Sequence, residues 1–497
     1  MRVKANLCRF DRNQLVKPNS TDINKKNTMT TFRIEHDFLG EKEISNDCYY
    51  GLQTMRAKEN FDITGIPIGS EPLFIQAFGY VKKAAALANK DLGILAPKKA
   101  EAIAYACDRL IAGEFADQFV SDLIQGGAGT STNMNANEVI ANLGLEYLGH
   151  QKGEYQYLHP NNDVNLSQST NDAYPSAFRI AVYLKIASFS QALEELQAAF
   201  YNKGKEFEGV LKMGRTQLQD AVPMTLGQEF NAFATTLGED VLRIREASLL
   251  ITEVNMGATA IGTGVNAPEG YAQLCVKYLA EISQVPVTLA ADLIEATYDT
   301  GALVQLSGTL KRNAIKLSKI CNDLRLLSSG PRCGLNEINL PAMQPGSSIM
   351  PGKVNPVIPE LMNQTCYYVI GADLTVTMAA EAGQLQLNVM EPVMGMALFT
   401  SLQYLTKACR TLKDKCVVGI TANVEHSKNM VMQSIGIVTQ LNPILGYEEC
   451  SSIAKEALAS GKSIYEIVVI ERKLISQAKW EEIYSIENLI HPKFIAQ

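Results

Sequence analysis

Residues 303 to 331, LVQLSGTLKRNAIKLSKICNDLRLLSSGP, indicate the fold class of this chain more clearly than any other stretch. Apolar residues recur there with a mean period of about 3.5, which is typical of a long amphipathic helix. These positions are Leu303, Leu306, Leu310, Leu317, Ile320, Leu324 and Leu327. The pair Gly330-Pro331 marks the point where such a helix must stop. A helix with this near-heptad spacing needs helical neighbours to cover its apolar face.

A second stretch, beginning past residue 175, has the same kind of pattern. Its apolar residues recur in steps of four and three: Val182, Ile186, Phe189, Leu193, Leu196 and Phe200. Two helices of this length predict an all-α protein built around a bundle of long helices. The spacing leaves open whether the neighbouring helices belong to the same chain or to another copy of it.

The composition excludes several classes of protein. The chain has 497 residues, of which 46% are hydrophobic and 20% are charged, so we expect a globular protein of two or three domains. A net charge of −7 and the lack of a basic run argue against a nucleic-acid partner. No apolar stretch approaches the roughly 18 residues needed to cross a membrane. The ten cysteines are scattered without a C-x-x-C pair, which predicts reduced thiols in a cytoplasmic protein.

Residues 1 to 28 differ from the rest of the chain. They carry seven Lys/Arg against two Asp and lack the apolar core of a signal peptide, so we interpret them as a disordered extension. A transit peptide is the weaker alternative, because the segment has two aspartates and little serine. Met29 is then a candidate for the true start of the protein.

Residues 346 to 356, GSSIMPGKVNP, combine helix-breaking residues with hydrogen-bond donors. Two glycines and two prolines rule out a continuous helix or a central strand there. The donors between them are the groups that a carboxylate needs, and they are Ser347, Ser348, Lys353 and Asn355. This composition predicts a mobile loop that closes over an anion. An ordinary polar surface turn is the alternative.

Neutral donors also gather in three other blocks. GAGTSTNMNAN, residues 127 to 137, contains Thr130 and Asn133; QSTND, residues 168 to 172, contains Ser169, Thr170 and Asn171; and GRTQLQD contains Thr216 and Gln217. The first two blocks have the composition of helix N-caps, which is a purely structural interpretation. Capping and anion binding are compatible, since a helix N-terminus offers free N–H groups to an anion.

The three blocks GAGTSTNMNAN, QSTND and GSSIMPGKVNP together resemble the aspartase/fumarase superfamily, whose members eliminate ammonia, water or an amine to give fumarate. The resemblance spans most of the chain. It implies a three-domain fold, with domains at residues 29 to 170, 171 to 425 and 426 to 497. It further implies a homotetramer whose central helices form one shared bundle, with each active site built from three subunits.

The resemblance also assigns roles in the reaction. Loss of a β-proton from a dicarboxylate leaves an enediolate with two negative charges, which preorganised donors can stabilise. The resemblance implies that Ser347 is the base. It implies that the enediolate is held by Thr130, Ser169, Thr170 and Ser348. It implies that Lys353 and Asn355 hold the other carboxylate, and that the leaving group faces Asn171, Thr216 and Gln217.

Gln217 separates the reactions known in this superfamily. Fumarases of this type carry histidine at this position, and hydroxide benefits from a general acid when it leaves. An ammonium substituent leaves as neutral ammonia, so glutamine suffices. The segment GRTQLQDAVPMTLGQEF likewise resembles the aspartase branch. We therefore expect reversible elimination of ammonia from L-aspartate to give fumarate. Hydration of fumarate and a non-catalytic structural or binding role, as in related lens crystallins, are the alternatives.

Some features of the expected site stay unassigned. The expected reaction requires no organic cofactor and the five dispersed histidines form no metal-ligand cluster, although activation by Mg²⁺ stays open. Arg56 and Glu337 belong to segments that resemble the family, and neither has a role from its sequence context. We interpret Glu337 as structural, because Gln217 provides no imidazole for it to orient.

Overall fold

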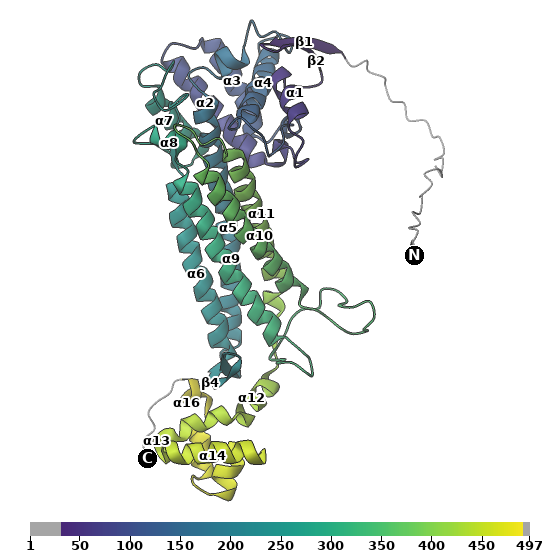
Figure 1. The fold of residues 1–497 in the computed structure, drawn as a ribbon, viewed down its shortest axis with the longest axis vertical. Helices are drawn as coiled ribbons and strands as arrows, with labels where there is room; N and C mark the ends of the chain where they lie inside the picture. Colours follow the sequence, from purple (N-terminus) through teal and green to yellow (C-terminus); the bar gives the residue numbers. More distant parts are fainter. Residues whose placement is uncertain (1–30, 491–497) are drawn as a thin grey trace, which may run out of the picture.

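A computed structural model describes residues 31 to 490 of the chain. The expected extension, residues 1 to 28, and the candidate start at Met29 lie outside this described part. The molecule is elongated: a bundle of long helices joins a group of helices at its upper end to a smaller group at its lower end (Figure 1). The predicted all-α class is confirmed, since the strands are short and occur only as two-stranded sheets in the described chain.

Five long helices form the bundle and alternate in direction along it (Figure 1). They are α5 (Thr170–Glu206), α6 (Leu226–Leu250), α9 (Gly301–Leu327), α10 (Val357–Glu381) and α11 (Glu391–Lys415). α5 packs against α6 and α11, and α10 packs against α9 and α11. Because α9 runs downward and α10 runs upward, the segment between them lies at the lower end of the bundle.

The two helices predicted from apolar spacing are both present. Every apolar residue of the predicted stripe in α9 is buried, and the helix ends at Leu327, before Gly330-Pro331. α5 begins at Thr170, earlier than the apolar pattern indicated. The cause is a capping box in which the Ser169 hydroxyl accepts from the backbone and the Asp172 carboxylate accepts from Ser169 N at 2.9 Å.

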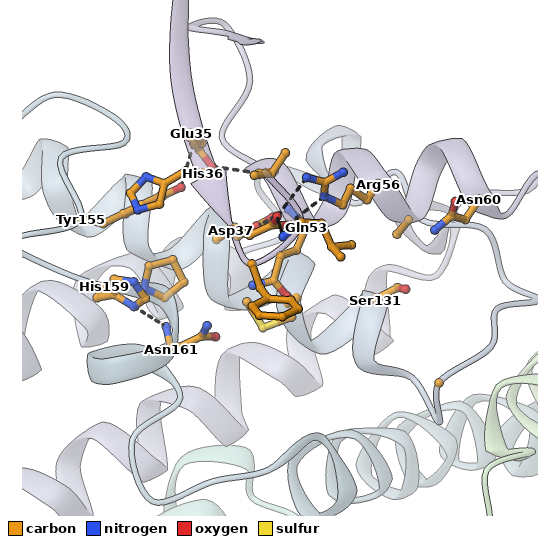
Figure 2. A pocket seen from close by; sticks show the side chains of 18 of the residues that line it. Glu35, His36, Asp37, Gln53, Arg56, Asn60, Ser131, Tyr155, His159 and Asn161 are labelled. Atoms are coloured by element: carbon orange, nitrogen blue, oxygen red, sulfur yellow. Dashed lines mark hydrogen bonds and ion pairs between the residues drawn. The ribbon is translucent and has the colours of Figure 1, made fainter. Parts of the chain in front are cut away.

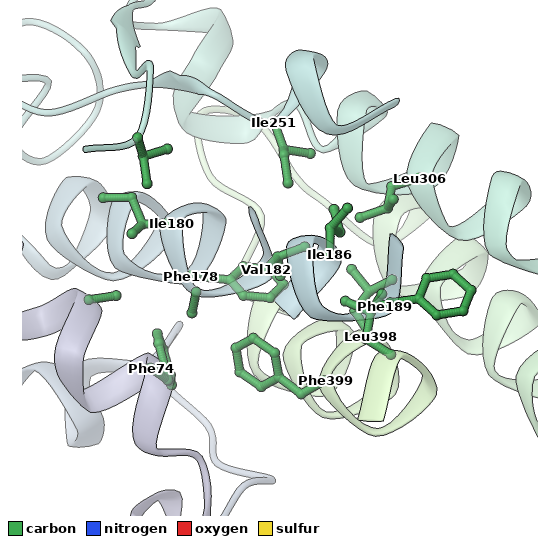
Figure 3. Close-up of a cluster of buried hydrophobic side chains, with 14 of the residues drawn as sticks. Phe74, Phe178, Ile180, Val182, Ile186, Phe189, Ile251, Leu306, Leu398 and Phe399 are labelled. Atoms are coloured by element: carbon green, nitrogen blue, oxygen red, sulfur yellow. The ribbon is translucent and has the colours of Figure 1, made fainter. Parts of the chain in front are cut away.

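The upper group surrounds the starts of α4 and α5. It contains the antiparallel hairpin β1 (Phe32–Asp37) and β2 (Gly40–Ser45), and the helices α1 (Leu52–Asn60), α2 (Pro72–Asp91), α3 (Pro97–Ile111), α4 (Thr130–Tyr147), α7 (Tyr271–Ser283) and α8 (Glu295–Tyr298). Phe74 of α2, Phe178 of α5 and Phe399 of α11 meet at ring-centroid distances of 5.3 to 6.5 Å (Figure 3). The upper group and the bundle therefore share one apolar core.

The lower group has a core of its own. It contains the hairpin β3 (Leu211–Thr216) and β4 (Gln219–Thr225), and the helices α12 (Val424–Gln433), α13 (Asn442–Leu445), α14 (Tyr447–Ser460), α15 (Gln477–Ile483) and α16 (Ile486–Ile490). Leu211 and Met213 of β3 are buried in the same cluster as Ile453 and Trp480. Two residues of the expected central segment thus pack in the core of the C-terminal segment.

Two further pairs of very short strands tie loops together. β5 (Glu253–Val254) pairs with β6 (Thr288–Leu289) in parallel, and β7 (Ile338–Asn339) pairs with β8 (Thr421–Ala422) in an antiparallel arrangement. Within residues 31 to 490, no helix has both the length and the apolar character needed to span a membrane.

Candidate functional site

The first group of predicted site residues lies where α4 begins. Gly127 and Gly129 both have positive φ, at 84° and 87°, and a Cβ on Gly129 would lie 2.2 Å from the ring of Tyr174. Only glycine fits this turn, which brings the chain sharply into the helix. Thr130 is the first helical residue, and its hydroxyl donates to the Gly127 carbonyl at 2.7 Å. Its exposed side chain therefore stands at a helix N-terminus, where free N–H groups favour an anion.

The structure brings the QSTND block beside this turn. Asn133 Nδ2 of α4 donates to Thr170 Oγ1 of α5 at 3.2 Å, which joins the two blocks directly. Ser169 caps α5, and Asn171 Nδ2 donates to the Ala260 carbonyl at 2.7 Å. Thr130, Ser169, Thr170 and Asn171 thus gather around two helix N-termini. The capping interpretation is correct for Ser169, whose hydroxyl accepts from Asn171 N at 3.2 Å and so satisfies part of the N-terminus of α5 within the chain.

The second group lies at the lower end, in the turn of the β3–β4 hairpin. Thr216 and Gln217 are both exposed there, and Gln217 has a positive φ of 52°. Buried charges anchor this hairpin: Arg215 Nη1 donates to Glu337 Oε1 at 2.7 Å, and Lys212 Nζ lies 3.2 Å from Glu337 Oε2. Glu337 is fully buried. It holds the hairpin against the segment that follows α9, which is the structural role expected for it.

The GSSIMPGKVNP segment forms an irregular loop between α9 and α10, as its composition predicted, and projects away from the lower half of the bundle (Figure 1). Ser347 Oγ accepts hydrogen bonds from the backbone N–H groups of Ile349, at 3.2 Å, and Met350, at 3.1 Å. Two such donors stabilise a serine alkoxide relative to its hydroxyl, because hydrogen bonds to the charged form favour it.

The ends of this loop are tied together. Gly346 N donates to the Lys353 carbonyl at 2.6 Å, and Asn355 Nδ2 donates to the Gly346 carbonyl at 2.9 Å. Asn355 uses one amide N–H in this way and keeps the second N–H and its oxygen for a ligand. Ser348 and Lys353 are exposed on the same loop. The loop therefore presents Ser347, Ser348, Lys353 and Asn355 as one unit.

The two groups lie at opposite ends of the bundle. α5 has 37 residues and separates Thr170 from the β3–β4 hairpin, so these residues are about 55 Å apart at a rise of about 1.5 Å per residue. A single chain cannot place Thr170 and Gln217 around one small substrate. The structure therefore brings Thr130, Ser169, Thr170 and Asn171 together, but it leaves Thr216 and Gln217, and the Ser347 loop, apart from them within one copy.

A cavity of about 840 Å³ lies beside the upper group, between β1, α1, α4 and the residues after Tyr155. Figure 2 shows Arg56 facing Asp37 at this cavity, with His159 and Asn161 on another side. Arg56 holds Asp37 through two hydrogen bonds, of 2.8 and 2.9 Å, which lower the pKa of that carboxyl. His159 Nδ1 accepts from the backbone N–H groups of Asn161 and Asn162, so its proton lies on Nε2.

None of the ten predicted site residues lines this cavity, although Gly127 and Ser131 flank Thr130 at its edge. Arg56, which had no role from the sequence, is part of a bidentate ion pair at the cavity wall. In residues 31 to 490, no three His, Cys, Asp or Glu side chains are placed to hold a metal ion.

Lys82 of α2 is a charged residue beside the site that sequence reasoning did not identify. It is fully buried, and burial lowers its pKa to about 7. Its Nζ donates to Asn165 Oδ1 at 2.9 Å and to Gln168 Oε1 at 2.8 Å, next to the QSTND block. A signal was present in the sequence, because Lys82 follows Phe74 and Phe78 at intervals of four on the buried face of α2.

Comparison with known proteins shows the family to which this chain is similar. A family model described as lyase matches residues 40 to 371, and one described as fumarase C C-terminus matches residues 437 to 491. An aspartate ammonia-lyase of Pseudomonas aeruginosa is 61% identical over 93% of this chain and 98% of its own length. An aspartate ammonia-lyase of Escherichia coli is 58% identical over 94% of this chain and 97% of its own.

Solved structures agree with the sequence relatives. A fumarate lyase:delta crystallin of Brucella melitensis has a TM-score of 0.89 and 53% identity, and the match covers 91% of this chain and 98% of that one. A class II fumarase of Schistosoma mansoni has a TM-score of 0.88 and 34% identity, over 93% of this chain and 100% of that one. The chain therefore belongs to the lyase family of the aspartase/fumarase superfamily.

Proposed function

We propose that this protein is an aspartate ammonia-lyase, which reversibly eliminates ammonia from L-aspartate to give fumarate. The observation that carries the proposal is the identity of 58 to 61%, over nearly the whole length of both chains, to enzymes named for this reaction. The glutamine at position 217 supports it, because a leaving ammonia needs no general acid.

Ser347 takes the β-proton of aspartate in the proposed reaction. The backbone N–H groups of Ile349 and Met350 stabilise the serine alkoxide, and the positive charge of Lys353 on the same loop assists them. The electron pair of the broken C–H bond passes into the neighbouring carboxylate and forms the enediolate. It then returns to make the double bond as the C–N bond breaks, and nitrogen leaves as ammonia.

The upper half of the site stabilises the enediolate. Ser169 and Thr170 stand at the N-terminus of α5, and Thr130 stands at the N-terminus of α4, where the helix dipoles favour negative charge. In the proposed reaction the Thr130 hydroxyl turns its proton from the Gly127 carbonyl to the substrate. Ser348 adds a hydroxyl from the loop. Neutral donors of this kind stabilise the dianion without adding positive charge to the site. They act mainly on the negative charge that develops in the transition state.

The remaining residues orient the substrate. Lys353 and Asn355 bind the α-carboxylate, the lysine as a compact charge and the asparagine through its free amide N–H. Asn171, Thr216 and Gln217 face the amino group and accept hydrogen bonds from the ammonium. Because Gln217 does not titrate, it binds this ammonium without acting as an acid or base.

We propose a homotetramer because each chain carries the two halves of the site at opposite ends of its bundle. In the proposed tetramer, one neighbouring chain brings its β3–β4 hairpin and another brings its Ser347 loop to the upper end of the first chain, so that each site draws on three subunits. The outer face of α10 supports this association. It exposes an apolar stripe with helical spacing formed by Tyr367, Leu374 and Met378, whose exposed fractions are 56, 63 and 59%, with Gly371 between them.

The proposed reaction takes place in the cytoplasm and uses no organic cofactor. Activation by Mg²⁺ is tested by treating the protein with a chelator and then measuring L-aspartate turnover at increasing Mg²⁺ concentrations. The three expected domains, residues 29 to 170, 171 to 425 and 426 to 497, stay part of the proposal.

Incubation of the purified protein with L-aspartate and, separately, with L-malate tests the proposed function. Fumarate is followed by its ultraviolet absorbance. Fumarate from aspartate alone is the expected result. Fumarate from malate alone would identify a fumarate hydratase and show that Gln217 does not discriminate between the two reactions. A lack of product from both would favour a non-catalytic role or a different substrate.

A further inference from the structure

The environment of Lys82 is unusual for a buried charge. The side chain is fully buried in the upper group, and no described carboxylate lies within ion-pair distance of it, although the charge of the buried Asp172 acts on Lys82 against the effect of burial on its pKa. Its hydrogen-bond partners are two neutral amide oxygens, Asn165 Oδ1 and Gln168 Oε1. Burial of a charge without an ion pair costs stability, so a residue that serves only packing would be apolar here. A buried ionisable group beside a candidate site is a reason to look for a functional role.

The hydrogen bonds of Lys82 determine how the neighbouring side-chain amides are oriented. Lys82 Nζ donates both of these hydrogen bonds, so Asn165 turns its amide oxygen toward Lys82. The same oxygen accepts from Asn133 Nδ2 and from Asn137 Nδ2, each at 3.1 Å. Asn165 Nδ2 donates to the Gln168 carbonyl at 3.2 Å, which is consistent with this orientation. Asn133 must therefore present its NH₂ group, and not its oxygen, to this side.

The same chain of hydrogen bonds reaches Thr170, a residue of the predicted site. The second N–H of Asn133 donates to Thr170 Oγ1 at 3.2 Å. Because this oxygen already accepts from Asn133, the Thr170 hydroxyl proton is free to be donated to a ligand. If the Asn133 amide were reversed, its oxygen would accept that proton, and Thr170 would have no donor for an anion.

We propose that Lys82 is a positioning residue: through Asn165 and Asn133 it fixes the direction of a hydrogen-bond chain, so that the Thr170 hydroxyl donates to the reacting carboxylate of the substrate. This inference rests on the proposed function, since it concerns the same enediolate. Lys82 does not touch the substrate in this proposal. Its effect falls on the transition state, where the donor from Thr170 faces the most negative charge.

A purely structural role for Lys82, holding residues 165 to 168 against α2, makes different predictions. A structural defect reduces the number of competent sites, and this lowers kcat without changing the affinity of the sites that stay intact. A lost donor weakens the binding of an enediolate mimic at every site. The nitronate form of 3-nitropropionate carries the charge of the enediolate, whereas succinate carries only two ordinary carboxylates.

The experiment compares inhibition of L-aspartate turnover by these two probes in the full-length protein. In Lys82→Met we expect kcat to fall at least about tenfold and the inhibition constant of the nitronate to rise at least about tenfold, which corresponds to the loss of one hydrogen bond to a charged group. The inhibition constant of succinate should change less than about threefold on the same argument. Lys83→Met is the matched control, because the neighbouring Lys83 is partly exposed and pairs with Asp108 on the outer side of α2.

Unchanged nitronate inhibition in Lys82→Met would overturn the proposal, whether or not kcat falls. If Lys82→Met does not assemble, Asn133→Leu interrupts the same chain one step nearer Thr170 and should show the same selective loss for the nitronate. Failure of the proposed function is distinguishable, because the wild type and Lys83→Met would then make no fumarate from aspartate, and that result would remove this inference as well.

Discussion

The proposed base, Ser347, lies in a setting that gives a physical reason why a hydroxyl could act as a base. Its oxygen accepts two hydrogen bonds from backbone N–H groups within an irregular loop. The same loop contains Lys353 and has no aspartate or glutamate between residues 346 and 356. Ser347→Ala should reduce kcat for L-aspartate by about 10²- to 10⁴-fold, which is the usual contribution of a positioned acid or base. Steady-state kinetics would measure this change.

The matched control is Ser328→Ala. Ser328 lies at the end of α9, where its hydroxyl donates to the Leu324 carbonyl at 2.8 Å, so this variant removes a serine from the same region without touching the loop. Its kcat should stay near that of the wild type. Turnover by Ser347→Ala comparable to that of Ser328→Ala would exclude Ser347 as the base.

Sequence reasoning at the residue scale succeeded where a residue stood among backbone-breaking neighbours. The GSSIMPGKVNP stretch predicted an irregular loop with several hydrogen-bond donors, and the structure has such a loop. Lys82 was missed because lysine is rarely buried, so its position on the apolar face of α2 was not interpreted as burial. The hydrogen bonds that orient Thr170 come from α4 and from residue 165, which no spacing in the sequence connects.

At the scale of elements, the β3–β4 hairpin depends on a buried cluster of charges. Glu337 is fully buried and pairs with Arg215 and Lys212, which lie on β3. Glu337→Gln should destabilise the protein by about 3 kcal/mol, because it leaves Arg215 without a carboxylate partner while Lys212 keeps its ion pair with Glu229. The hairpin carries Thr216 and Gln217, so turnover of L-aspartate should fall with it. Thermal unfolding and the fumarate assay would measure both effects.

Glu425→Gln in α12 serves as the control, since Glu425 is exposed and belongs to the neighbouring helix of the lower group. Its unfolding temperature and turnover should match those of the wild type. An unchanged unfolding temperature for Glu337→Gln would contradict the anchoring role given to this cluster.

The elements divide clearly into those that apolar spacing predicts and those that it does not. α5 and α9 followed from recurring apolar residues, because each buries a continuous face in the bundle. The start of α5 did not, since the capping box of Ser169 and Asp172 depends on polar side chains and not on burial. The β3–β4 hairpin was also not predicted. Its strands are stabilised by the lower core and by Glu337, which is more than a hundred residues away in sequence.

In the whole molecule, the proposed tetramer associates through the exposed face of α10. Met378→Asp places a charge in the apolar stripe and should dissociate the tetramer, because a buried unpaired charge is strongly unfavourable in an interface. Turnover should be lost together with assembly. Sedimentation velocity and the fumarate assay on the same preparation would test this prediction.

Leu458→Asp in α14 is the control for that experiment. Leu458 is also a large exposed apolar residue, at 72%, but it lies in the lower group away from the bundle. This variant should keep the assembly and activity of the wild type. Retention of the tetramer by Met378→Asp would show that α10 does not form the interface.

The division of the site between the two ends of the chain could not be deduced from the sequence blocks alone. The sequence blocks identified the donor groups, and the family resemblance implied that groups from different chains form one site. Only the length of α5, which places Thr170 about 55 Å from the hairpin, gives a physical reason why one chain is insufficient.

Mixing two impaired variants tests whether a site assembled from different chains eliminates ammonia from L-aspartate. Ser347→Ala and Thr170→Val are unfolded together in equal amounts and reassembled, and fumarate formation from L-aspartate is measured. Each site draws its serine and its threonine from different chains, so random reassembly should restore about a quarter of the activity of wild type treated in the same way. Hybrid tetramers that form, as native mass spectrometry would show, but stay as inactive as the separate variants would contradict the account.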